Sequence, residues 1–356
     1  MSTLEKLEIE IAEKIRNYRK NDLSVKMDEK HVDTWVTQFE ENDRLVILQE
    51  TNNILNHCYF DSNRIEAFFE DLWNTPDILG INQYKRIPEI QFLNIQTKGN
   101  SQKLLLDLLN SYYQKNKSIN INFSNHSNVT KYIYIDDCMY TGETIRHNLK
   151  EWLSNNTFNN KCELDIIFLA FYTGNYDYNL DYLQKIASDK GIKVNIYRQI
   201  EYNNILNDYP YDFLWPCAVD GDTYVDQYIE VIEEEKRQKS CGGIGFRKAP
   251  NYYYSESELF TSSNNRMIYE QALMKAGSYI YSLPQSKSYR MRPMGFSSNI
   301  SLGFGAFFVT CYNISNNCPL ALWWGDSTAY TGHPFSKWYP LFPRKTNTSG
   351  GDTIEW

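Results

Sequence analysis

Two adjacent carboxylates and a short hydroxyl-containing turn form the segment of the chain with the clearest chemistry. Asp136 and Asp137 follow the apolar run 131–135, and the sequence Thr-Gly-Glu-Thr follows at 141–144. A glycine lets the backbone turn tightly, and the amides of a following helix N-terminus favour an anion. Carboxylates accept hydrogen bonds from sugar hydroxyls or bind a metal ion. Because no GxGxxG is present, the spacing favours a pentose 5-phosphate over a dinucleotide.

The segments around this turn are those that would position it. The run KYIYI has the composition of a buried strand, and ETIRHNLKEWL, at 143–153, has a helical apolar stripe. The members of that stripe are Ile145, Leu149, Trp152 and Leu153. The sequence therefore predicts that the turn joins the end of a strand to the start of a helix.

The same alternation of strand and helix continues on both sides of this segment. Strands are predicted at 89–95, 131–135, 162–172 and 192–200, and helices at 100–114, 143–153 and 180–191. This alternation is typical of an α/β fold with a parallel sheet. Ligands of such sheets bind at the carboxyl ends of the strands, where Asp136 and Asp137 are expected.

Three regions of different character suggest a domain organisation. Residues 1–87 carry helical apolar patterns, residues 88–240 hold the alternating core, and residues 241–356 are mixed. The Gly-rich stretch CGGIGF marks the second boundary. The last region has a helical pattern at 265–277 and strand-like runs, GAFFVTCYNI and ALWW. We expect a helical N-terminal region and a mixed α+β C-terminal segment to pack around the core.

Composition and charge indicate a globular protein and disfavour several other classes. Of the 356 residues, 42% are hydrophobic and 22% charged, which is a globular composition. A net charge of −8 disfavours a general nucleic-acid surface and leaves room only for a local basic groove, and we expect contact with nucleic acid to be indirect. The sequence has neither a long apolar span nor a signal-peptide pattern, and its seven cysteines form no CxxC pair. We expect a cytoplasmic protein with reduced thiols that does not enter membranes.

The segment YIYIDDCMYTGET resembles the PRPP-binding motif of type I phosphoribosyltransferases. The resemblance implies an α/β fold of that type and a transferase site that binds 5-phosphoribosyl-1-pyrophosphate (PRPP) with Mg²⁺. It implies that the acidic pair binds the ribose hydroxyls and the metal, and takes part in catalysis. The corresponding residues are Asp136 and Asp137 for the acidic pair, and Thr141, Gly142, Glu143 and Thr144 for the 5-phosphate loop. The stretch QTKGNSQ is similar to the pyrophosphate loop, with Lys98, Gly99 and Ser101 in the corresponding positions.

Other stretches narrow the resemblance to one subgroup. HVDTWVTQFEENDRLVIL, RMRPMGF with LGFG, PLALWW and WYPLFPR resemble the phosphoribosyltransferase-like proteins of bacterial conflict systems, and the resemblance extends from about His31 to Arg344. It implies an antiviral defence role in an anti-phage cassette, some of which are linked to retrons. Protein partners such as a winged-helix protein and a reverse transcriptase are then expected.

Two departures from the motif leave the activity open. Tyr140 stands where purine salvage enzymes of this class have an aspartate that acts on the base, and Glu143 places a carboxylate beside the expected phosphate. The chain is therefore expected to be either a phosphoribosyltransferase or a non-catalytic nucleotide- or PRPP-sensing subunit that binds partners. The aromatic run Trp323, Trp324, Trp338, Tyr339 and Phe342 could stack a base, pack in a core or form an interface.

Overall fold

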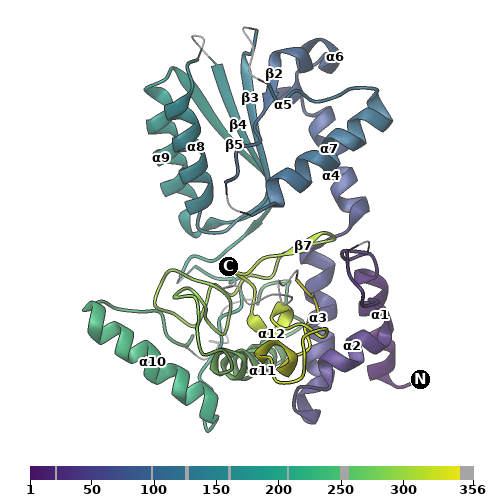
Figure 1. Ribbon diagram of the computed structural model, residues 1–356, viewed down its shortest axis with the longest axis vertical. Coiled ribbons are helices and arrows are strands. Elements are labelled where there is room, and N and C mark those ends of the chain that lie inside the picture. Colours follow the sequence, from purple (N-terminus) through teal and green to yellow (C-terminus); the bar gives the residue numbers. More distant parts are fainter. Residues whose placement is uncertain are drawn as a thin grey trace. The chain divides into compact units, whose positions relative to one another are not determined.

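The computed structural model describes residues 1–20, 22–97, 99–124, 128–158, 162–206, 208–248 and 256–344 (Figure 1). The chain forms two compact units. One, the sheet unit, is Ser62–Asp208, and the other, the discontinuous unit, combines Met1–Asp61 with Tyr209–Trp356. The domain boundaries predicted from the sequence, at residues 88 and 241, differ from the limits of these two units. They remain a prediction.

The sheet unit is built on four parallel strands. They are β2 (Ile90–Phe92), β3 (Lys131–Met139), β4 (Cys162–Tyr172) and β5 (Ile192–Tyr202), in the order β2-β3-β4-β5. Strand β4 pairs on both edges and nearly all of its residues are buried, which explains its continuous apolar sequence. The α/β fold class with a parallel sheet flanked by helices, as expected for a type I phosphoribosyltransferase-like protein, is confirmed.

Helices cover both faces of this sheet. The helices α8 (Glu143–Asn155) and α9 (Tyr176–Ser188) share a core with alternate residues of β3, β4 and β5, and α7 (Ser101–Lys117) lies on the other side (Figure 1). The hydroxyl of Tyr113 in α7 donates to the carbonyl of Phe69 in α4 (Ser62–Asn74) at 3.1 Å. The remaining short helices of this unit are α5 (Pro76–Leu79), α6 (Gln83–Arg86), η2 (Ile87–Glu89) and η3 (Thr173–Asn175).

A buried ion pair lies where β3, β4 and β5 begin. Lys131 Nζ donates to Asp165 Oδ2 at 2.7 Å, and Asn195 Nδ2 donates to Asp165 Oδ1 at 2.8 Å. Lys131 Nζ also contacts the Glu163 carboxylate at 3.2 Å. Lys131 is 3% exposed and Asp165 is 0% exposed. The pair therefore links the first parts of the three strands, one of which carries the acidic residues of the candidate site.

Replacing Lys131 by methionine is expected to destabilise the protein by about 3–5 kcal/mol, because it leaves the Asp165 carboxylate buried without its cation. Urea unfolding measures the loss. The double variant Lys131→Met with Asp165→Asn removes both charges and is expected to recover most of the stability. A single variant as stable as the wild type would show that the pair does not support the sheet.

The regular secondary structure of the discontinuous unit is mainly helical, and long irregular segments connect its helices. Its helices are α1 (Thr3–Ile15), α2 (Glu29–Val36), η1 (Glu41–Asp43), α3 (Arg44–Cys58), α10 (Thr223–Lys239), α11 (Ser263–Ser282), α12 (Leu320–Trp323) and η4 (Pro334–Lys337). A small sheet has the order β1-β6-β7, from Tyr59–Phe60, Val309–Thr310 and Asn313–Ile314. The helical prediction for the N-terminal region is confirmed. The strand predicted at ALWW is wrong, because this run follows Pro319 and forms one helical turn, α12.

The aromatic run near the C-terminus belongs to the core of the discontinuous unit. Trp323 and Trp338 are buried, and their indole nitrogens donate to the carbonyls of Cys318 at 2.7 Å and Ala321 at 2.9 Å. Trp35 of α2 donates to the same Ala321 carbonyl at 3.0 Å. These rings therefore join the first and last parts of the chain, and packing accounts for them.

His31 connects α2 to this C-terminal segment as a neutral imidazole. Its Nε2 lies 2.8 Å from the Leu341 carbonyl and must donate, so its Nδ1 accepts from the Tyr339 hydroxyl at 2.8 Å. Burial lowers the pKa of His31 below its ordinary 6.5. The unfolded chain then takes up a proton at a higher pH than the folded one.

This linkage predicts that the protein loses stability as pH falls below about 6.5, the range in which His31 is protonated only when unfolded. Urea midpoints at pH 7.5 and pH 5.5 measure the loss. In His31→Gln, which has no titratable ring, the midpoint is expected to move less between the two pH values. An equal pH effect in both proteins would assign the dependence to other groups.

Within the described residues, no helix has the length and apolar character needed to cross a lipid bilayer. All seven cysteines lie in the described part of the chain, and no two of them form a disulfide bond there.

Candidate functional site

Both predicted carboxylates lie in a strand at the centre of the sheet. Strand β3 continues through Asp136 and Asp137 to Met139, and it is paired with β2 on one edge and β4 on the other. Asp136 is opposite Phe168 of β4. The two side chains therefore lie near the carboxyl end of a parallel strand, the edge at which ligands of such sheets bind.

The two carboxylates have different hydrogen-bond partners. Asp136 is 6% exposed and accepts from the Ser101 hydroxyl at 2.9 Å, the Tyr134 hydroxyl at 3.1 Å and the amide of Asp137 at 2.9 Å. Asp137 is only partly buried, and its Oδ1 accepts from the amide of Cys138 at 2.7 Å. Ser101, predicted from the pyrophosphate-loop resemblance, is thus brought to the acidic pair.

The electrostatics of this pair are unfavourable without a ligand. Burial raises the pKa of the Asp136 carboxyl, against the effect of its hydrogen bonds. Burial, and then the charge of Asp136, raise the pKa of the Asp137 carboxyl well above its ordinary 3.8. A cation or hydroxyl donors would stabilise the ionised pair, as at many functional sites.

The predicted phosphate loop lies between β3 and α8. Gly142 caps α8 in a left-handed conformation, with φ of 74°, and the Thr141 hydroxyl accepts from the Glu143 amide at 3.4 Å. Glu143 and Thr144 are exposed and Thr141 is half-buried. The first amides of a helix lack intrahelical acceptors, so this loop can bind an anion through backbone and hydroxyl groups.

Two side chains that were not predicted from the sequence donate hydrogen bonds to the backbone of this loop. Asn179 of α9 is 0% exposed, and its Nδ2 donates to the Thr141 carbonyl at 3.3 Å. Arg146 donates to the same carbonyl at 3.2 Å and also to Asn179 Oδ1. Arg146 lies one turn into the motif helix and could have been suspected for its charge, whereas Asn179 is far away in sequence and gives no local signal.

The predicted pyrophosphate loop joins β2 to α7. Lys98 lies outside the described residues. Gly99 has φ of 84°, which favours glycine, and Ser101 is the first residue of α7. The Thr97 hydroxyl donates to Asn148 Oδ1 of α8 at 3.3 Å, which ties this loop to the motif helix.

A pair of glutamines folds the β2–α7 loop on itself. Gln102 Oε1 accepts from the amides of Ile95 and Gln96, both at 2.9 Å, and Gln96 Oε1 accepts from the Gln102 amide at 3.1 Å. Gln96 Nε2 also donates to the Ser101 hydroxyl at 3.2 Å. These bonds join Ile95 and Gln96 to the start of α7, where the Ser101 hydroxyl contacts Asp136.

The residue that departs from the family pattern is packed against another ring. Tyr140 stacks on Tyr172 at the end of β4, with ring centroids 5.7 Å apart and an angle of 22° between the planes. Tyr172 is buried. The position that carries an aspartate in purine salvage enzymes therefore presents an aromatic side chain here.

The donor set can accept a hard divalent cation. Among the described residues, no group of three or more His, Cys, Asp or Glu side chains has the arrangement of a complete metal site. Asp136 and Asp137 provide two carboxylates, and Mg²⁺ commonly binds through one or two carboxylates together with water and substrate phosphates. The residues therefore fit Mg²⁺ that arrives with a diphosphate ligand.

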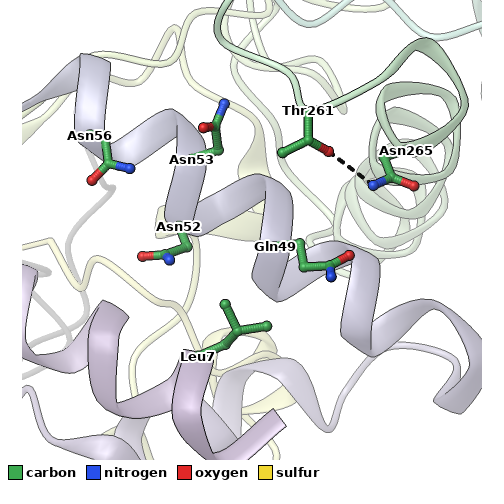
Figure 2. A pocket seen from close by; sticks show the side chains of 7 residues that line it. All are labelled: Leu7, Gln49, Asn52, Asn53, Asn56, Thr261 and Asn265. Atoms are coloured by element: carbon green, nitrogen blue, oxygen red, sulfur yellow. Dashed lines mark hydrogen bonds between the residues drawn. The ribbon is translucent and has the colours of Figure 1, made fainter. Parts of the chain in front are cut away.

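The discontinuous unit contains a pocket lined mainly by polar side chains, which we do not assign to ligand binding. It has a volume of about 260 Å³ and lies among α1, α3 and the start of α11 (Figure 2). Asn52 donates to Glu10 at 2.8 Å, and Asn53 donates to the Glu258 carbonyl at 3.0 Å and the Leu259 carbonyl at 2.9 Å. These amides join packed segments, so we assign them to packing.

Fold and site together define a phosphoribosyltransferase-like protein. The family model PRTase-CE matches residues 32–344, and the chain belongs to the PRTase-CE family. No curated protein and no solved structure matches this chain.

Proposed function

We propose that the protein binds PRPP, or a related ribose 5-phosphate ligand, as its magnesium complex. The 5-phosphate lies on the loop Thr141–Thr144, and the ribose hydroxyls lie at the acidic pair. Asp136 and Asp137 hold Mg²⁺, which neutralises the charge of the diphosphate. Lys98, Gly99 and Ser101 belong to the loop that receives the pyrophosphate.

One observation carries this proposal. The acidic pair of β3 and the phosphate loop at the start of α8 lie on the same short segment of chain, and the loop backbone is held by Asn179 and Arg146. Helix N-terminal amides next to two adjacent carboxylates with raised pKa values support a ligand that has both a phosphate and hydroxyl groups.

We further propose that the protein is an effector or component of a bacterial anti-phage defence system, in the cytoplasm. Membership of the PRTase-CE family supports a phosphoribosyltransferase-like function. The resemblance of its other motifs supports protein partners from a defence cassette, such as a winged-helix protein and a retron reverse transcriptase, with nucleic acid contacted only through them. The seven cysteines form no disulfide bond among the described residues, which suits a reducing compartment.

A second candidate function is non-catalytic sensing of PRPP or a nucleotide. The observation that favours it is Tyr140, which has a stacked ring where salvage enzymes have a catalytic carboxylate. Such a subunit binds the ligand and transmits its presence to partners without transferring the phosphoribosyl group.

Calorimetry with PRPP and Mg²⁺ tests the proposal. We expect saturable binding that weakens when Mg²⁺ is chelated, and weaker binding of ribose 5-phosphate, which lacks the diphosphate. If neither PRPP nor ribose 5-phosphate binds, the proposal is wrong. Pyrophosphate release from PRPP, measured with nucleobases and with candidate partners present, then separates the transferase from the sensor.

A further inference from the structure

We infer that the two aspartates have different roles: Asp137 contacts the ligand, and Asp136 is a positioning residue that fastens the β2–α7 loop to β3 through Ser101. This inference rests on the proposed ribose phosphate site and revises it in one respect. The contacts to the ribose and to Mg²⁺ that the motif assigns to both carboxylates belong to Asp137, and Asp136 supports them from behind the site. It follows from the partners and the exposure of each side chain.

The Asp136 carboxylate is already occupied by donors from the protein. The Ser101 hydroxyl and the Asp137 amide both donate to Oδ1, each at 2.9 Å, and the Tyr134 hydroxyl donates to Oδ2 at 3.1 Å. A carboxylate has room for about four hydrogen bonds, so three are used. With 6% of its surface exposed, Asp136 has little access to a ligand.

Asp137 is in the opposite situation. It is partly exposed, and its Oδ1 accepts from the neighbouring Cys138 amide at 2.7 Å. Within the described part of the chain, no side chain from another element donates to its carboxylate. A ligand hydroxyl or a cation can therefore reach Asp137 without breaking a contact between elements.

The contact between Ser101 and Asp136 connects the two loops of the site. Ser101 begins α7, and its hydroxyl also accepts from Gln96 in the β2–α7 loop at 3.2 Å. If Asp136 turned to a ligand, it would lose its hydrogen bonds to Ser101 and Tyr134, and their hydroxyls would need new acceptors. Asp136 is therefore expected to stay in place and keep the pyrophosphate loop beside Asp137.

Matched substitutions at the two aspartates test the inference by calorimetry with PRPP and Mg²⁺. In Asp136→Asn the new amide can accept from Ser101 and donate to Tyr134, so binding is expected to weaken by less than about fivefold. Asp137→Asn removes the contacting charge, and binding is expected to weaken by about 50-fold or more. Equal losses in the two variants, or a larger loss in Asp136→Asn, would overturn the inference.

Variants of Ser101 test the fastening contact through the same binding assay. Ser101→Ala is expected to weaken binding by about tenfold, because the pyrophosphate loop is released from Asp136. Ser101→Thr keeps the hydroxyl and is expected to restore affinity to within about threefold of the wild type. Loss of affinity in Ser101→Thr equal to that in Ser101→Ala would contradict a role for the hydroxyl.

A ligand-free measurement separates failure of this inference from failure of the proposed function. In urea unfolding, the shifts in midpoint caused by Ser101→Ala and Asp136→Ala should be less than additive in the double variant, because each removes the same contact. Additive shifts would refute the fastening role. Coupled shifts in a protein that binds no PRPP would refute the proposed function and the ligand role of Asp137, while the fastening role of Asp136 would stand.

Discussion

Gly142→Ala is expected to reduce the affinity for PRPP at least about 100-fold, which corresponds to about 2.7 kcal/mol. Gly142 has φ of 74°, a conformation that costs an L-residue about 1–2 kcal/mol. A Cβ added there would lie 2.2 Å from Asn179 Nδ2 and 2.4 Å from its Cγ. Because Asn179 is buried and holds the Thr141 carbonyl, either that side chain or the loop backbone must move.

Gly191→Ala is the matched control for this substitution. Gly191 lies in the same unit with φ of 71°, and an added Cβ would meet no atom within 4 Å. Both variants therefore have a similar backbone strain, but only Gly142→Ala disturbs the loop. Calorimetry with PRPP and circular dichroism measure affinity and folding. Affinity of Gly142→Ala within threefold of the control would mean that the loop does not bind the phosphate.

Asp137→Asn is expected to weaken ligand binding by about 50-fold or more and, at the same time, to stabilise the ligand-free protein. Burial and the charge of Asp136 raise the pKa of Asp137, so the ionised side chain is unfavourable in the fold. An amide removes that charge, and the same charge is what the ligand complex requires. A residue that lowers stability while it supports binding is typical of a functional site.

The pH dependence of this effect has a definite sign. Because the folded pKa of Asp137 lies above the ordinary 3.8, the folded state retains a proton that the unfolded state has lost. The wild type therefore loses stability relative to Asp137→Asn as pH rises from about 4 through the raised pKa. Thermal melts at several pH values measure the difference, with the exposed Asp181→Asn of α9 as a control. A variant less stable than the wild type at neutral pH would contradict the account.

Local patterns predicted the sheet unit well. The apolar run 162–172 coincides with β4, since a strand buried on both faces has a continuous apolar sequence. The order of strands and helices around the motif is also as predicted. The motif also predicted that Asp136, Asp137 and the loop lie together at the end of one strand, because only a few residues separate them along the chain.

Contacts between segments that are distant in the chain could not be predicted from the sequence. Nothing near Asn179 indicates that it holds the Thr141 carbonyl, and nothing in the motif indicates that Ser101 occupies Asp136. The grouping of Met1–Asp61 with Tyr209–Trp356 depends on buried contacts such as that of Trp35 with the Ala321 carbonyl. A single sequence contains local preferences, whereas these pairings arise from tertiary packing.

A crystal structure of the protein with PRPP and Mg²⁺ would show where the 5-phosphate binds. We expect density for it on the loop Thr141–Thr144 at the start of α8, with the ribose beside Asp137. A phosphate bound elsewhere, with this loop free of density in the presence of saturating PRPP, would contradict this expectation.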